Sequence, residues 1–95
     1  MSIADWRTQI DDVDNRLLRL LNQRAELASI IGRLKQDANL PLHDKRREHS
    51  VLARLCAVNA GPLDETAVTV IFQHIISETR RIEARVHSPH ANVNG

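Results

Sequence analysis

The chain has 95 residues and a formal net charge of +1, with 13 Lys and Arg against 12 Asp and Glu, one Trp, one Phe and no Tyr. This composition argues against a nucleic-acid interface, and no run of about 18 apolar residues or signal peptide points to a membrane. The single cysteine, Cys56, excludes an internal disulfide and favours a reducing compartment, so we expect a cytoplasmic protein. Leu, Ile, Val and Ala dominate, while Gly and Pro are few, which predicts one all-helical domain.

The first predicted element is one long helix. Apolar residues recur in steps of four and three from Trp6 to Leu34, which predicts an amphipathic helix over residues 6–36. Ser2 or Asp5 is expected to cap it, because both side chains accept a hydrogen bond from a free backbone N–H. At 1.5 Å per residue the helix is roughly 48 Å long. The rest of so short a chain cannot easily cover it, so we expect a homodimer.

Two shorter helices are predicted after a linker over residues 37–43. Asp44 is placed to cap a helix that ends near Asn59, where a Gly-Pro pair follows. Asp64 is placed to cap a third helix, whose apolar stripe continues to Val86. The expected order is therefore a long, a short and a medium helix.

This pattern sets the expected domain boundaries. The folded domain is predicted over residues 1–86, because the periodic apolar stripe reaches that far. Residues 87–95 lose all periodicity and are expected to form a disordered tail.

Cations on the apolar face of the first helix are the sharpest functional signal. Arg24 and Lys35 have no acidic residue three or four positions away, and burying an unpaired cation costs several kcal/mol. Each of the cations on this helix could also have a purely structural role. Arg24 could bond an acid of another helix, Lys35 could be solvated in the last turn, and Arg7 could pair with Asp11.

The other two helices also bring polar groups to apolar faces. Asp44, Arg47 and Glu48 share one turn, and Thr79 lies one turn before Glu83. Singly, these residues could serve as a cap, as a hydrogen bond back to the helix, or as a pair between Glu83 and Arg80. Together they predict a buried pocket with an excess of cations, suited to a small anion such as a dicarboxylate. No metal-ligand spacing or phosphate-binding loop is recognisable, so we expect neither metal nor cofactor.

Three segments carry these residues at intervals that resemble a known family. The matching positions are Arg7, Ile10, Asp14, Arg24, Ile31, Gly32 and Lys35, then Pro41, Asp44, Arg47 and Glu48, then Ile71, Phe72, Ile75, Thr79 and Glu83. In order and spacing they resemble the all-helical chorismate mutases, from Trp6 to about Val86. The resemblance implies an intertwined homodimeric helical bundle with two active sites. It also implies a cofactor-free pericyclic rearrangement of chorismate to prephenate, on the shikimate pathway to phenylalanine and tyrosine.

The resemblance also implies roles for the cations. Arg24 and Arg7 of the partner chain would clamp the two substrate carboxylates, for which guanidinium forks are suited. Lys35 would bond the ether oxygen and a carboxylate. Arg47 would support the site electrostatically.

The remaining implied roles belong to four other residues. Glu48, with the backbone at Asp44, would hold the ring hydroxyl, and Thr79 would bond a carboxylate. Glu83 stands where the family often has Gln, which donates an N–H to the ether oxygen. Because a glutamate can donate only when protonated, we expect activity to fall as pH rises through neutrality.

Other functions remain open at this point. An isochorismate–pyruvate lyase of the same fold shares the cationic pocket, although the turn from Asp44 to Glu48 favours the mutase. A non-catalytic helical dimer or regulatory module, such as one that docks on a larger shikimate-pathway enzyme, would have no use for an unpaired Arg24. An anion-binding module without turnover is the remaining alternative.

Overall fold

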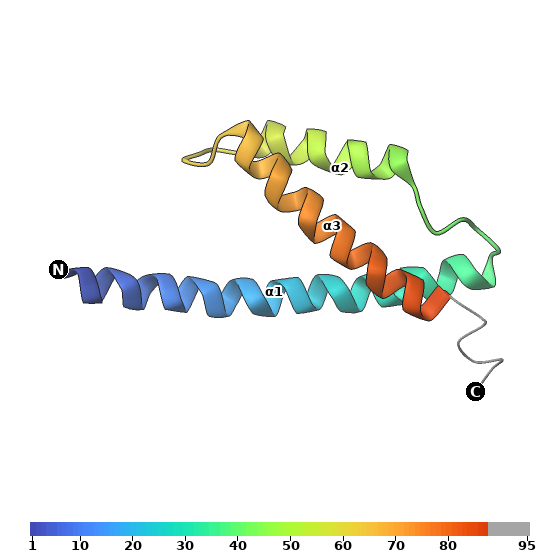
Figure 1. Ribbon diagram of the computed structural model, residues 1–95, viewed down its shortest axis with the longest axis horizontal. Helices are drawn as coiled ribbons and strands as arrows, with labels where there is room; N and C mark the ends of the chain where they lie inside the picture. Colours follow the sequence, from blue (N-terminus) through green and yellow to red (C-terminus); the bar gives the residue numbers. More distant parts are fainter. Residues whose placement is uncertain (88–95) are drawn as a thin grey trace.

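The structure is a computed structural model that describes residues 1–87 as three helices and no strands. The helices are α1 (Ile3–Asp37), α2 (Lys45–Val58) and α3 (Glu65–His87). Figure 1 shows α3 running from the end of α2 down to the C-terminal half of α1, while the N-terminal half of α1 extends alone. The all-α prediction and the long, short, medium order are therefore confirmed. The predicted disordered tail lies outside the described residues, except for His87, which belongs to α3.

The start of α1 is fixed by a reciprocal pair of side-chain hydrogen bonds. Ser2 Oγ accepts from Asp5 N at 3.2 Å, and Asp5 Oδ2 accepts from Ser2 N at 2.8 Å. Each bond satisfies a backbone donor that a helix N-terminus leaves free. Ser2, one of the two predicted caps, is therefore the cap and Asp5 is its partner, so α1 begins at Ile3.

The other helix starts follow the prediction. Asp44 Oδ1 accepts from Arg47 N at 3.0 Å, and Asp64 Oδ1 accepts from Ala67 N at 2.7 Å. Both carboxylates also lie at the positive end of a helix dipole. The turn between α2 and α3 includes Gly61 at φ +81°, a backbone conformation that favours glycine. Asp44 thus fixes the orientation of the first turn of α2.

The crossing of α1 and α3 is close because Gly32 lies in it. A Cβ atom at Gly32 would stand 2.6 Å from Val86 Cγ2 and 3.0 Å from the backbone oxygen of Glu83. The missing side chain lets the two backbones approach each other at this point. Lys35, one turn later on α1, is thereby brought beside Glu83 on α3.

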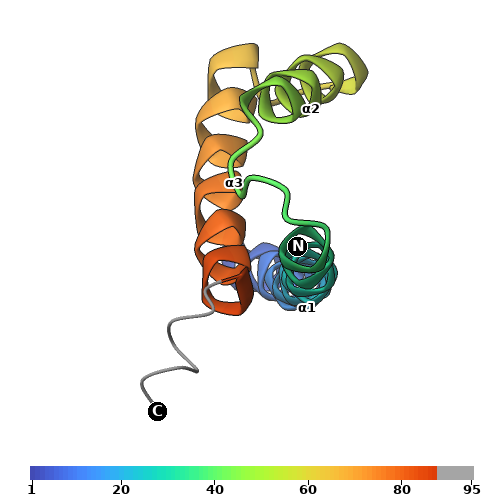
Figure 2. The ribbon, with the colours of Figure 1, turned by 90° about the vertical axis from the view of Figure 1, so that its right-hand side faces the viewer.

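The interior of a single chain is thin. Within residues 1–87 the buried apolar side chains are Ala28, Val51, Val68 and Ile76, and no large side chain is fully buried. Figure 2 shows α1 and α2 both lying against α3, with α1 viewed along its axis. None of the described helices is long and apolar enough to cross a membrane.

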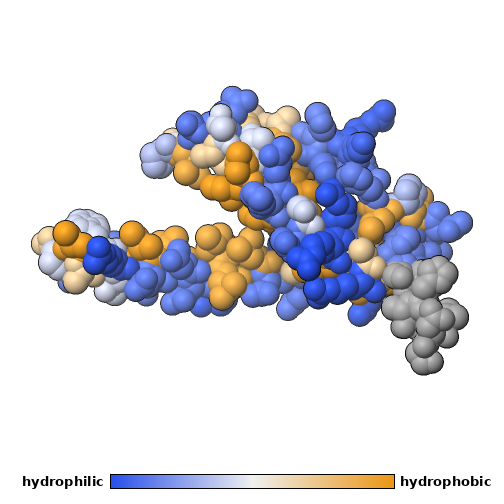
Figure 3. Space-filling model, in the orientation of Figure 1, coloured by the Kyte–Doolittle hydropathy of each residue, from blue (hydrophilic) through white to orange (hydrophobic). Residues whose placement is uncertain are grey.

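Much of the apolar stripe of α1 is consequently exposed. Figure 3 shows apolar side chains along the part of α1 that extends beyond α3. Trp6 is 54% exposed and Leu20 is 62% exposed, although the helical pattern predicts that both are covered. The other exposed large apolar side chains of this stripe are Ile10, Val13, Leu17, Leu27, Ile31 and Leu34.

Candidate active site

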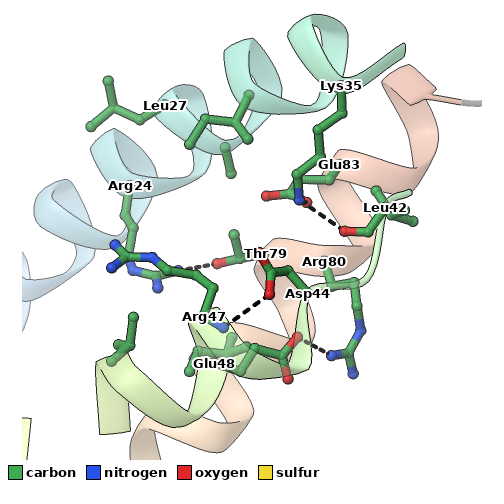
Figure 4. A pocket seen from close by; sticks show the side chains of 14 residues that line it. Arg24, Leu27, Lys35, Leu42, Asp44, Arg47, Glu48, Thr79, Arg80 and Glu83 are labelled. Carbon is green, nitrogen blue, oxygen red and sulfur yellow. Dashed lines mark hydrogen bonds and ion pairs between the residues drawn. The ribbon is translucent and has the colours of Figure 1, made fainter. Parts of the chain in front are cut away.

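One cavity of about 350 Å³ lies between the three helices. Its walls come from α1, α2, α3 and the linker between α1 and α2, as Figure 4 shows. Seven of the eight predicted site residues line it, and the exception is Arg7. The seven are Arg24, Lys35, Asp44, Arg47, Glu48, Thr79 and Glu83. Residues far apart in the sequence are thus brought to one cavity, and their roles remain predictions.

Arg24 reaches from α1 to α3. Its Nη1 donates to Thr79 Oγ1, and the Thr79 hydroxyl in turn donates to the Ile75 carbonyl at 2.8 Å. Thr79 therefore both bonds its own helix and orients Arg24. Within residues 1–87 no carboxylate forms a salt bridge with Arg24, so the alternative of an acid from another helix is not found in the described part.

Lys35 connects α1 with α3 and with the linker. Its Nζ lies 3.1 Å from Glu83 Oε2 and donates to the Leu42 carbonyl at 2.8 Å. The side chains are 20% and 12% exposed, so a fully solvated Lys35 is the wrong interpretation. Glu83 accordingly pairs with Lys35 and not with Arg80, which was its ordinary alternative.

Glu48 is held by two groups that the sequence did not mark as site residues. Arg80 Nη1 lies 2.6 Å from Glu48 Oε2, and His43 Nε2 lies 3.1 Å from the same oxygen. Partial burial raises the pKa of the Glu48 carboxyl, but hydrogen bonds and charge from Arg80 and then from His43 outweigh it. The pKa of Glu48 is therefore lower than usual, and its carboxylate is ionised at neutral pH.

A sequence signal for Arg80 existed. Ile76, Thr79, Arg80 and Glu83 have the spacing of one helix face, and all four line the cavity. The apolar stripe of this helix passes through Thr79 but not through Arg80. Reading the face around Thr79 and Glu83 as polar would have included Arg80.

Arg47 and Asp44 complete the wall formed by the start of α2. The backbone N–H of Arg47 donates to Asp44, while its side chain forms no salt bridge within residues 1–87. In Figure 4 the side chains of Arg24 and Arg47 extend toward the same end of the cavity. Four cations and three carboxylates line the whole cavity, so its formal charge is positive.

Comparison with known proteins identifies the family. The family described as "Chorismate mutase type II" matches residues 6–84. The chain belongs to this family. The predicted resemblance to the all-helical chorismate mutases is therefore confirmed.

Known chorismate mutases resemble the chain in both sequence and structure. The "Chorismate mutase" of Methanocaldococcus jannaschii is 27% identical over 97% of this chain and 94% of its own length. A solved chorismate mutase (form II) from Thermus thermophilus has a TM-score of 0.86 and 36% identity, and the match covers 87% of this chain and 94% of that one.

Some relatives of this mutase family are longer. The "Bifunctional chorismate mutase/prephenate dehydratase" of Aquifex aeolicus is 35% identical over an alignment of 88 residues, and the match covers 88% of this chain and 24% of that protein. The chain thus spans about a quarter of the length of that bifunctional relative.

Arg7 remains outside the cavity of this mutase chain. It lies in the free N-terminal half of α1, about 25 Å along the helix axis from Arg24. The predicted surface pair with Asp11 is not formed among residues 1–87. No group of three or more His, Cys, Asp or Glu side chains in the described part is arranged to hold a metal ion.

Proposed function

We propose that the chain catalyses the rearrangement of chorismate to prephenate. The observation that carries the proposal is the pair of guanidinium groups, Arg24 and Arg47, that line the cavity without a carboxylate partner among residues 1–87. Chorismate is a dicarboxylate, and a guanidinium fork matches a carboxylate with two parallel hydrogen bonds. The three acids in the cavity leave these groups available, because Glu83 is held by Lys35, Glu48 by Arg80, and Asp44 by the backbone N–H of Arg47.

The proposed mechanism is positioning combined with electrostatic stabilisation. One ether C–O bond breaks while one C–C bond forms within the same molecule, so no group is transferred to the enzyme. The cavity must hold the substrate in a compact, chair-like geometry. Arg24, oriented by Thr79, would hold a carboxylate in this geometry, with Arg47 adding positive charge.

Negative charge develops on the ether oxygen as the C–O bond breaks. Lys35 would donate a hydrogen bond to this oxygen, and its interaction is stronger in the transition state than with bound substrate. Glu83, at 3.1 Å from Lys35, would donate a second hydrogen bond when protonated. On the other side, ionised Glu48 and the backbone at Asp44 would hold the ring hydroxyl.

A second copy of the chain would complete the site. Arg7, which the resemblance assigns to a substrate carboxylate, does not line the cavity of its own chain. Arg7 of a second copy would supply this guanidinium. An antiparallel partner lying along α1 would bring Arg7 toward Arg24 and would cover the exposed apolar stripe. We therefore propose an intertwined homodimer with two shared sites.

A link to other enzymes of the pathway is a further part of this proposal. In the Aquifex aeolicus relative, chorismate mutase and prephenate dehydratase belong to one bifunctional protein. Docking on an enzyme that consumes prephenate would shorten the path of this product between the two sites.

The test is the loss of chorismate absorbance with the purified protein and with Arg24→Ala. We expect the unaltered protein to form prephenate and Arg24→Ala to lose about 10²–10³-fold in kcat/KM, as for removal of one charge-stabilising donor. Arg33→Ala is the matched control, since Arg33 is an exposed arginine of the same helix outside the cavity.

The possible failures of this test have different meanings. An unchanged rate in Arg24→Ala would contradict the assigned clamp. No turnover of chorismate by the unaltered protein would contradict the mutase, and isochorismate would then be assayed for pyruvate release. Binding without any product would favour the non-catalytic module.

A further inference from the structure

Glu48 uses only one of its two carboxylate oxygens inside the protein. Oε2 receives both Arg80, at 2.6 Å, and His43, at 3.1 Å. Within residues 1–87 no hydrogen bond reaches Oε1. Two partners on one oxygen fix the orientation of the carboxylate plane and leave the other oxygen available to a ligand.

The position of Glu48 gives its carboxylate an alternative orientation. It lies on the wall between the candidate active-site cavity and a neighbouring cavity of about 390 Å³. Arg80 also lines both cavities, whereas His43 lines only the neighbouring one. Both partners therefore determine which way the side chain turns.

Without these partners Glu48 would be attracted to the substrate-binding cations. Arg47, on the preceding residue of α2, lines the same cavity and has no carboxylate partner in the described part of the chain. An ion pair between Glu48 and Arg47 would occupy a guanidinium that the proposed function assigns to the substrate. With Oε2 on Arg80, this oxygen of Glu48 already has a cationic partner from α3.

We propose that Arg80 is a positioning residue, which holds Glu48 Oε2 so that Oε1 faces the ring hydroxyl of the substrate. This inference rests on the proposed function. It gives Arg80, a residue of α3, an indirect role in recognition of the ring hydroxyl. Arg80 acts on the substrate only through Glu48. His43 is the second group that holds Glu48 Oε2. The ring hydroxyl carries no developing charge in the reaction, so the loss of this hydrogen bond weakens substrate and transition state alike.

The test is a double-mutant cycle of Arg80→Met and Glu48→Gln, with kcat and KM measured for chorismate. We expect Arg80→Met to raise KM about tenfold with kcat within about twofold, the signature of lost uniform binding. In the Glu48→Gln background, Arg80→Met should change kcat/KM by less than about twofold, because the two residues act as one unit. Arg80→Lys should restore part of the lost affinity, since it keeps the charge.

Arg81→Met is the matched control. Arg81 is the next residue of α3, and it pairs with Glu78 on an exposed surface where both side chains are 65% exposed. We expect its kcat and KM to equal those of the unaltered protein. Additive effects of Arg80→Met and Glu48→Gln would overturn the proposal, because they would mean that Arg80 acts on the substrate independently of Glu48.

A second measurement separates this inference from the proposed function. Carbon-13 NMR of the assigned Glu48 carboxyl gives its pKa in the unaltered protein and in Arg80→Met, with no need for turnover. We expect the pKa to rise in Arg80→Met, and an unchanged pKa would contradict the contact itself. A protein that shows this rise but leaves chorismate untouched would refute the mutase and retain the Arg80–Glu48 pair, while overturning the role in hydroxyl recognition.

Discussion

At the scale of single residues, the proposed mechanism needs two carboxyls of the candidate site in opposite protonation states. In this mechanism Glu48 would accept a hydrogen bond as a carboxylate, whereas Glu83 would donate one in its protonated form. Arg80 and His43 face Glu48 from α3 and from the linker, and Lys35 faces Glu83 from α1. Each acid therefore has its own cationic partners.

A pH profile of activity tests this pair. Because the pKa of Glu48 is lowered, its contribution is present at neutral pH and is lost only as pH falls below the ordinary glutamate value of about 4.3. The proposed hydrogen bond from Glu83 to the ether oxygen exists only while this carboxyl carries a proton, whereas a Gln side chain donates at every pH. We expect kcat/KM to decline through neutrality, and we expect Glu83→Gln to remove that decline.

The measurement is kcat/KM for chorismate from about pH 3 to about pH 9, on both proteins. Glu83→Gln should keep the acid limb, because Glu48 is unaltered. A flat profile of the unaltered protein through neutrality would show that a protonated Glu83 is not required.

Sequence reasoning located some of these residues better than others. Arg24 and Lys35 stand out because no acid of their own helix can pair with them, which is a local property. Arg80 is different, since its partner Glu48 lies on another helix and the contact depends on how α2 and α3 pack. Spacing along one helix cannot report such a contact.

At the scale of elements, the crossing of α1 and α3 places Lys35 beside Glu83. The helix bounds followed from the apolar period and the capping residues, which are local signals. The crossing could not be predicted from such local signals, because the importance of Gly32 depends on Val86 and Glu83 of another helix. Packing of this kind is decided by the distance between backbones.

Gly32→Ala tests the crossing. The added Cβ would meet Val86 Cγ2 at 2.6 Å and the backbone of Glu83 at 3.0 Å, and the backbone cannot move without separating the helices. We expect a loss of about 1–3 kcal/mol in the free energy of unfolding, as for an overpacked core. This corresponds to a fall in Tm of about 4–8 °C per kcal/mol, measured by circular dichroism.

Arg33→Ala, at the next and exposed position, is expected to stay within about 0.5 kcal/mol of the unaltered protein. A stable Gly32→Ala protein with unchanged activity would mean that the two helices need not approach so closely.

At the scale of the whole molecule, one chain provides neither a full interior nor all of the predicted site residues around its cavity. The extents of 57 × 30 × 15 Å describe a flat, elongated body, and the free half of α1 carries Arg7 and much of the exposed apolar stripe. The proposed second copy accounts for both features with one contact. The dimer was expected from helix length alone, and the exposed stripe supports it.

Mixing two inactive variants tests shared sites. In a mixed dimer of Arg7→Ala and Arg24→Ala, one site carries both substitutions and the other carries neither. Equal mixing with subunit exchange is therefore expected to restore about a quarter of the unaltered activity, since half of the dimers are mixed and each has one intact site. The rate of chorismate loss before and after exchange measures this, with each variant alone as control. A mixture that stays inactive would show that the site does not use Arg7 of a second copy.

The thin interior of the single chain has a consequence for every rate and melting temperature measured on this protein. With the second copy proposed above, folding and association form one linked equilibrium, and mass action makes the folded fraction depend on the amount of protein in solution. Dilution then lowers the folded fraction and the number of complete substrate sites together. A turnover number per chain consequently has a meaning only at a stated enzyme concentration.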